Sequence, residues 1–100
     1  MRKQILYHAT TPENAKIILQ EGIKRKNGFA VYLSENPLSW WKPGMVVLRV
    51  RITGLKGLHT FLPESDEILS FEDISPLRIN GEYKIPRRML RNYRKEKDHA

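Results

Sequence analysis

Residues 45–53 alternate cleanly between two sets of side chains. The positions expected to face inward are all apolar: Val46, Leu48, Val50 and Ile52. The positions between them are Val47, Arg49 and Arg51. Because successive side chains of a strand point to opposite faces, this pattern predicts a half-buried strand of an antiparallel sheet.

A helix with clear start and stop signals is expected before this strand. Thr11 suits the N-cap, Pro12 suits the first helical position, and Glu13 puts a negative charge where the helix dipole favours it. Gly22 suits the left-handed position that follows a helix, with Ile23 as the hydrophobic residue after it. The residues expected on the buried face are Ala15, Ile18 and Leu19.

Other segments have the composition of short strands and turns. The strand candidates are residues 4–8, 29–34, 58–62 and 67–71, with an acidic turn over 63–66. Residues 35–37 should turn the chain into a short helical stretch that contains Trp40 and Trp41. Asn80-Gly81 lies between extended residues and predicts a hairpin within 77–85. A basic helix is expected from Arg87, fraying over 95–100.

Several short strands and one early helix predict an α+β domain with an open or sandwich-like sheet. The length of 100 residues is near the commonest domain size, and 40% hydrophobic residues can bury a real but small core. We place the domain over residues 1–86 and treat residues 87–100 as a basic C-terminal helix or tail.

The composition excludes several kinds of protein. The chain has no cysteine, which rules out disulfides, thiolate metal sites and cysteine catalysis. His8, His59 and His99 have no metal-ligand spacing, so we predict no metal. The N-terminal residues lead into a strand-like run rather than a signal peptide, and no segment approaches the roughly 20 apolar residues of a membrane span. We therefore expect a soluble, cytoplasmic protein without a membrane partner.

Positive charge is concentrated near the C-terminus. Residues 87–100 contain six Arg or Lys and two Asp or Glu, a balance of +4 within the net charge of +7. Such a segment favours anionic partners, RNA or DNA first and nucleotide phosphates next. The candidate nucleic-acid-binding residues are Arg87, Arg88, Arg91 and Arg94. A solvated tail that keeps the protein soluble is the alternative interpretation.

Three stretches, in this order, resemble the motifs of ADP-ribosyltransferase-like proteins. The first is Tyr7-His8-Ala9-Thr10, which leads into a helix ending in Glu21-Gly22-Ile23. The second is Val31-Tyr32-Leu33-Ser34, and the third is Asp66-Glu67-Ile68-Leu69-Ser70 with the turn Ile74-Ser75-Pro76. The resemblance covers residues 4–79. It implies a split antiparallel sheet or sandwich with one early helix, followed here by the basic C-terminal helix.

The resemblance also implies NAD as co-substrate and gives roles to individual residues. The catalytic set would be Glu67, His8 and Tyr32, and the cofactor-binding set His8, Thr10, Tyr32, Ser34 and Trp40. His8 would hydrogen-bond a ribose hydroxyl, Tyr32 or Trp40 would pack against the nicotinamide, and Glu67 would engage the nicotinamide ribose. A carboxylate at that point stabilises an oxocarbenium-like centre. By its charge, the loop Lys24-Arg25-Lys26 would meet the pyrophosphate.

The same residues have structural interpretations. His8 is equally well explained as a hydrogen-bonded structural histidine, and Tyr32 as a core or half-buried aromatic. Glu64 and Glu72 compete with Glu67 as the candidate carboxylate. Two adjacent tryptophans cannot both face the core, which favours one in the core and one on the rim.

Three functions remain open from the sequence. The first is transfer of ADP-ribose to nucleic acid or protein. The second is RNA 2′-phosphotransferase-like chemistry, because the second motif of those enzymes often reads His-Leu-Ser where this chain has Tyr32-Leu33-Ser34. Those enzymes usually carry a further N-terminal domain that supplies an arginine, which counts against that branch. The third is a non-catalytic module that binds a nucleotide or RNA.

Overall fold

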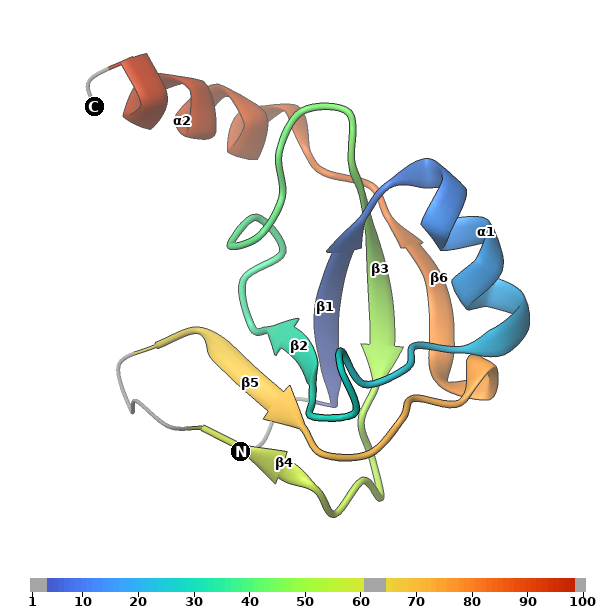
Figure 1. Cartoon of the computed structure of the whole chain (residues 1–100). Coiled ribbons are helices and arrows are strands. Elements are labelled where there is room, and N and C mark those ends of the chain that lie inside the picture. Colours follow the sequence, from blue (N-terminus) through green and yellow to red (C-terminus); the bar gives the residue numbers. More distant parts are fainter. Residues whose placement is uncertain (1–3, 61–64, 99–100) are drawn as a thin grey trace.

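The structure is a computed structural model that describes residues 4–60 and 65–98. Over these residues the chain forms an antiparallel sheet with the strand order β4-β5-β2-β1-β3-β6 and two α-helices, so the predicted α+β class is confirmed (Figure 1). The strands are β1 (Ile5–Thr10), β2 (Val31–Ser34), β3 (Val46–Arg51), β4 (Leu58–His59), β5 (Glu67–Ser70) and β6 (Ile79–Tyr83). The helices are α1 (Pro12–Glu21) and α2 (Arg87–Asp98), with a short 3-10 helix η1 (Pro76–Arg78).

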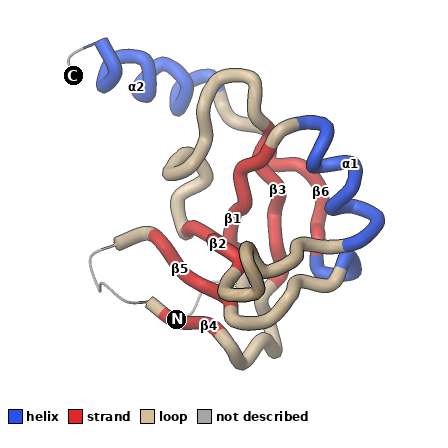
Figure 2. The backbone as a smooth tube through the Cα atoms, viewed as in Figure 1, coloured by secondary structure: helices blue, strands red, loops and turns tan. Residues whose placement is uncertain are grey.

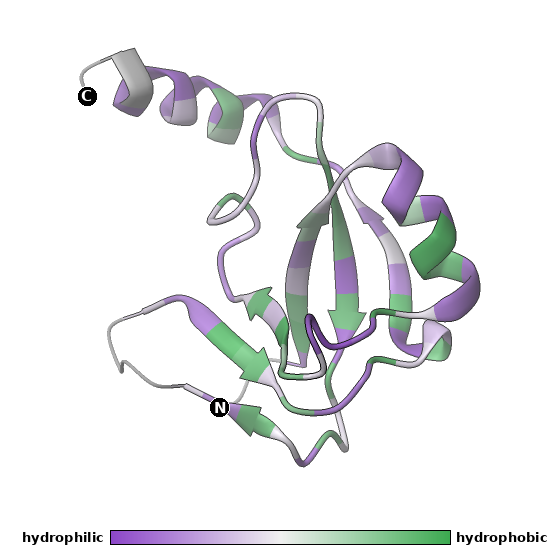
Figure 3. Ribbon diagram, viewed as in Figure 1, coloured by the Kyte–Doolittle hydropathy of each residue, from purple (hydrophilic) through white to green (hydrophobic). Residues whose placement is uncertain are grey.

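The predicted alternation along β3 is confirmed at Arg49 and Arg51 but not at Val47, which lies on their face and is fully buried. Leu48 and Val50 are buried in the core, and Val46 and Ile52 pack against it. Figure 3 shows the β3 ribbon changing between hydrophobic and hydrophilic colours along its length. The sheet is centred on the pairing of β3 with β1, which runs from Ile5 opposite Arg51 to Thr10 opposite Val46. The strand expected over residues 4–8 thus continues to Thr10, and His8 lies inside β1 rather than at its end.

Helix α1 begins and ends as the sequence predicts, but its buried face is narrower. The Thr11 hydroxyl accepts a hydrogen bond from the backbone N–H of Asn14, at 3.2 Å. Ala15 and Ile18 are buried, whereas Leu19 is 52% exposed and was wrongly expected on the inner face. The helix contacts β3 and η1 along a stripe through Ala15 and Ile18, and Leu19 lies about 100° further around the helix.

The predicted hairpin at Asn80-Gly81 is wrong, because both residues lie inside β6. Glu82 pairs with Leu48 and Ile79 pairs with Val50. Asn80 and Gly81 therefore face Arg49 together, which is a β-bulge. The segment before β6 forms η1 instead of a strand, so the turn residues have no partner strand with which to close a hairpin.

The helical stretch expected around the two tryptophans is also wrong. Residues 35–45 form a chain of turns and bends between β2 and β3 (Figure 2). The Asn36 side-chain oxygen accepts from the Leu38 N–H at 3.0 Å, which offers the backbone a turn in place of a helix. Pro43 and Gly44 then end any helical run.

Three other boundaries differ from the predictions. β2 begins at Val31 rather than Phe29, because Lys26 and Ala30 form a bridge that closes a turn between them. β4 covers only Leu58–His59, and residues 61–64 of the expected strand and acidic turn lie outside the described residues. α2 continues to Asp98 instead of fraying from Lys95. The division at residue 86 stays a prediction.

Candidate functional site

The sheet opens between β1 and β2. Tyr7 on β1 pairs with Ser34 on β2. The next pairs expected in this register, His8 with Leu33 and Ala9 with Tyr32, do not form within the described strands. On its other side, β1 keeps its pairing with β3 along its whole length. The described ladder between the two strands is therefore limited to this single pair.

The His8 imidazole lies at the opening. Its Nδ1 is 3.1 Å from the carbonyl oxygen of Tyr32 on β2. Because a carbonyl oxygen only accepts, Nδ1 donates, and in the neutral ring Nε2 is left as an acceptor. Burial lowers the pKa of His8, and the hydrogen bond to Tyr32 opposes this effect only in part. The neutral ring is therefore the favoured form at neutral pH.

Tyr32, Ser34 and Glu67 lie on one face of the sheet. Ser34 is opposite both Tyr7 on β1 and Glu67 on β5, and directly opposed residues of antiparallel strands point to the same face. Tyr32 is two residues from Ser34 on the same strand, so its side chain is a diagonal neighbour of Glu67 at about 7–8 Å between Cα atoms. Tyr32 is 36% exposed, so of its two structural interpretations the core position is wrong and the half-buried one fits.

His8 is joined to this row through the backbone of β2. Alternation along β1 puts its side chain on the opposite side of the strand from Tyr7. The His8 ring is connected to the strand that carries Tyr32 and Ser34 by its hydrogen bond to the Tyr32 carbonyl. The structure thus brings Tyr32 and Glu67 together on one face. The His8 side chain leaves β1 on the other face, opposite Leu48, and reaches β2 at the backbone carbonyl of Tyr32.

Thr10 and Ser34 are both buried. Thr10 lies at the end of β1 opposite Val46. The Ser34 hydroxyl donates to the Asn36 carbonyl at 2.9 Å and accepts from the Asn36 N–H at 3.0 Å. Ser34 therefore holds the turn that follows β2.

The competing carboxylate Glu72 has a structural role. It accepts from the N–H groups of Gly57, at 2.8 Å, and Lys56, at 3.0 Å, and these bonds lower its pKa. Glu64 lies outside the described residues. Glu67 is half-buried on β5, and its own N–H donates to the Ser65 hydroxyl at 3.0 Å. Glu67 is thus the carboxylate on the face of Tyr32.

In the basic loop expected at the pyrophosphate, Arg25 is engaged within the protein. Its backbone N–H and its Nε both donate to Asp73 Oδ1, at 2.8 and 3.1 Å. These contacts, the backbone hydrogen bond first, lower the pKa of Asp73. Lys24 and Lys26 are exposed.

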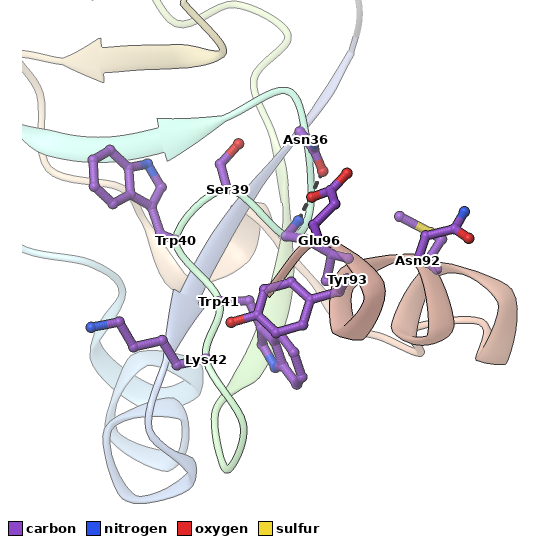
Figure 4. Close-up of a pocket in the computed structure, with 10 residues that line it drawn as sticks. Asn36, Ser39, Trp40, Trp41, Lys42, Asn92, Tyr93 and Glu96 are labelled. Carbon is purple, nitrogen blue, oxygen red and sulfur yellow. Dashed lines mark hydrogen bonds between the residues drawn. The ribbon is translucent and has the colours of Figure 1, made fainter. Parts of the chain in front are cut away.

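A groove of about 630 Å³ lies between residues 36–42 and α2. Its lining residues are Asn36, Leu38, Ser39, Trp40, Trp41, Lys42, Met89, Asn92, Tyr93 and Glu96. Trp41 meets Tyr93 edge to face with ring centres 5.2 Å apart, and its indole N–H donates to the Met45 carbonyl at 2.9 Å. Trp40 is 48% exposed, and its ring lies on the other side of the segment from Trp41 (Figure 4).

The sequence prediction of one tryptophan in the core is therefore wrong. The alternative from the sequence, a tryptophan that covers a cleft, fits the groove, but α2 was not anticipated as its other wall. Neither tryptophan is part of the buried core. The signal was present in α2, where Met89 and Tyr93 are four residues apart on a helix that is mostly charged. That spacing indicates an apolar stripe with a partner elsewhere in the chain.

One end of the groove is tied to the chain next to Glu67. The N–H of Glu35 donates to the Asp66 carbonyl at 3.0 Å. The Ser39 hydroxyl is 3.4 Å from the Asp66 carboxylate. The groove therefore adjoins the β2–β5 end of the candidate site.

The sequence was compared with protein-family models and with curated proteins, and neither comparison gives a match. In the part of the chain that the structure describes, no three His, Asp or Glu side chains gather in a way that suits a metal ion. Neither described helix has both the length and the apolar character needed to cross a bilayer.

Proposed function

We propose that the chain is an NAD-dependent transferase of the ADP-ribosyltransferase-like class, with the split sheet of that family. The observation that carries the proposal is the opening between β1 and β2, with His8 bonded to the Tyr32 carbonyl across it. Glu67 lies on the next strand, on the face that Tyr32 shares. The three motifs that resemble the family thus lie on three neighbouring strands.

The chemistry follows from the state of each side chain. NAD binds as the substrate, and a neutral His8 accepts a hydrogen bond at Nε2 from a ribose hydroxyl. The exposed Tyr32 ring packs against the nicotinamide. As the glycosidic bond breaks, nicotinamide leaves with the bonding electron pair and the Glu67 carboxylate stabilises the positive charge on the ribose. An acceptor hydroxyl or amine then attacks that carbon and loses a proton.

The test is nicotinamide release and NAD binding by purified protein, with and without RNA and single-stranded DNA. Glu67→Gln should lower release by about 10²–10³-fold, since it removes a charge that acts in the transition state, while NAD affinity stays similar. His8→Ala should weaken NAD binding. Glu82→Gln, a glutamate on the far edge strand β6, is the matched control and should release nicotinamide at the wild-type rate.

Equal release by wild type and Glu67→Gln would remove Glu67 from the mechanism. Absence of NAD binding at millimolar concentration would remove the proposal as a whole. An RNA substrate that loses a 2′-phosphate in the presence of NAD, without becoming ADP-ribosylated, would assign the RNA 2′-phosphotransferase-like branch instead.

A non-catalytic nucleotide- or RNA-binding module is the second candidate. The observation that favours it is α2, on which Arg87, Arg88, Arg91 and Arg94 are all exposed. Its expected result is nucleic-acid binding that falls steeply with salt, without NAD cleavage. Replacing these four arginines would then weaken binding far more than replacing His8.

A further inference from the structure

The groove between residues 36–42 and α2 has the surface chemistry of a nucleobase site. Trp41 and Tyr93 give it aromatic surface, and Leu38 and Met89 give it apolar surface. Asn92 carries a side-chain amide, which donates and accepts hydrogen bonds in one plane, as the edges of bases do. The Asn36 oxygen already accepts from the Leu38 N–H, so its amide N–H groups are what Asn36 offers to a base. Figure 4 shows Asn36 and Asn92 near the rim and the Trp41–Tyr93 pair between the segment and the helix.

The charge around the groove selects a polyanion. Among the α2 residues whose side chains are described, five are basic (Arg87, Arg88, Arg91, Arg94 and Lys95) and one is acidic (Glu96), a balance of +4. Aromatic surface beside a basic track is the combination that binds single-stranded nucleic acid. A base inside a duplex has both faces stacked and cannot enter such a groove.

We propose that this groove binds an unpaired base of a single-stranded nucleic acid, which is the acceptor of the transfer reaction. The acceptor role of the strand rests on the proposed function, whereas the binding of the strand in the groove does not. The contacts of Asp66 with Glu35 and Ser39 tie the groove to the residue before Glu67. A strand held in the groove therefore passes close to the carboxylate proposed for catalysis. Trp40 also lines the groove, on the other side of the segment from Trp41, and its half-exposed ring offers a stacking face to a neighbouring base.

The helical repeat separates the α2 cations into two groups. Arg88, Asn92 and Lys95 lie four and seven residues apart on one stripe, and Asn92 lines the groove. Arg88 and Lys95 therefore border the groove. Arg87, Arg91 and Arg94 form the adjacent stripe, which is further from it. The phosphates of a strand seated in the groove should meet Arg88 and Lys95 first.

The binding test uses fluorescein-labelled single-stranded DNA and RNA of about 12 nucleotides, a length within the range that such domains cover. Anisotropy is measured without NAD, at several salt concentrations, with a hairpin duplex as competitor. Single strands should bind more tightly than the duplex. Trp40→Ala should weaken binding by about tenfold, the loss typical of one stacked base. Asn92→Ala should weaken it by up to about tenfold, the loss typical of one hydrogen bond. Phe29→Ala removes an aromatic side chain of similar exposure, 51% against 48%, and should leave affinity unchanged.

The charge test compares two double variants with the same loss of charge on the same helix. Arg88→Gln with Lys95→Gln should lower the slope of log affinity against log salt by about 1.4, or 0.7 for each lost phosphate contact. Arg87→Gln with Arg94→Gln should lower it less. Circular dichroism of each variant shows whether α2 remains folded.

Equal binding of duplex and single strand, or equal effects of the two double variants combined with no effect of Trp40→Ala and Asn92→Ala, would overturn the inference. The proposed function fails separately. Strand binding without transfer of ADP-ribose leaves the groove assigned and removes the acceptor role. NAD cleavage without strand binding leaves the transferase and removes the groove.

Discussion

The Nδ1 atom of His8 donates to a carbonyl that lacks its ladder partner, and this contact joins two strands whose described ladder is limited to one pair. A single side chain thus takes the place of backbone pairing at the opening of the sheet. The ring is also desolvated, which lowers its pKa. Folding and the protonation state of the His8 imidazole are therefore coupled.

This coupling predicts a pH dependence of stability. The folded protein holds His8 neutral below the ordinary pKa of 6.5, where the unfolded chain binds a proton. Stability should therefore fall as the pH drops below 6.5 towards the folded-state pKa, and be unaffected by His8 above 6.5. Thermal unfolding between about pH 7.5 and about pH 5.5 should show a larger loss for wild type than for His8→Gln, whose side chain does not titrate. Equal losses would mean that His8 is not desolvated in the folded state.

The residues of the site were predictable in kind but not in arrangement. Local strand pattern predicts that His8, Tyr32 and Glu67 lie in strands, and the structure has them in β1, β2 and β5. Their roles come from the resemblance and stay predictions. That Ser34 holds its own turn, and that Glu72 caps two backbone N–H groups, depends on partners distant in the chain or on turn geometry that the strand pattern does not encode. The sequence alone could not decide which of Glu64, Glu67 and Glu72 is the best candidate for the catalytic carboxylate.

The junction after α1 shows how one element limits another. Gly22 has a φ of 80°, and a Cβ atom built there would clash with the carbonyl oxygen of Ile74. Ile23 and Ile74 exchange backbone hydrogen bonds of 2.9 and 2.8 Å. The end of the helix is thus packed directly against the segment that leads into η1.

Gly22→Ala should therefore destabilise the protein by roughly 3 kcal/mol, because a strained backbone adds to a clash that side-chain rotation cannot relieve. Gly28→Ala is the matched control. Gly28 also has a positive φ, 71°, but nothing lies within 4 Å of a Cβ atom there, so its cost should be roughly 1 kcal/mol. Urea denaturation of both variants measures the difference. Similar losses would mean that the junction relaxes around the added methyl group.

The type of each element, helix or strand, was predicted correctly where the sequence pattern extended over many residues. The predictions were wrong where they rested on a short motif. β3 and α1 have several residues of regular spacing and matched their predictions. Asn80-Gly81 is a strong turn signal only if a strand exists on each side of it, and the strand on one side is replaced by η1. The tryptophan segment failed because Asn36 diverts the backbone locally.

At the scale of the whole molecule, α2 lies away from the sheet and meets the body at a few side chains (Figure 1). Its contacts with the body include the Trp41–Tyr93 ring pair and a bond of 3.4 Å from the Tyr83 hydroxyl to the Met89 sulfur. The helix is strongly amphipathic, and its half-buried residues face the tryptophan segment.

Tyr93→Ala should release α2 without unfolding the sheet. Far-UV helicity should fall and tryptophan emission should shift to the red, while the unfolding free energy of the body changes by less than about 1.5 kcal/mol, the scale of one aromatic pair. Arg94→Ala, at the exposed neighbouring position, should keep both signals. Cooperative unfolding of the entire chain in Tyr93→Ala would contradict the predicted division at residue 86.

The two ends of the strand order have a consequence for self-association. An open sheet has two edge strands, and each edge is a template to which a second copy of the chain can add a strand. On one side β4 is only the pair Leu58–His59, and on the other the bulge at Asn80-Gly81 breaks the regular spacing of β6. A strand from a second copy would therefore have few backbone N–H and C=O groups to pair with along β4. Along β6 the bulge would put these groups out of register. A short edge strand and a bulge are two devices that proteins use against edge-to-edge pairing, so we expect both described edges of this sheet to disfavour fibre formation.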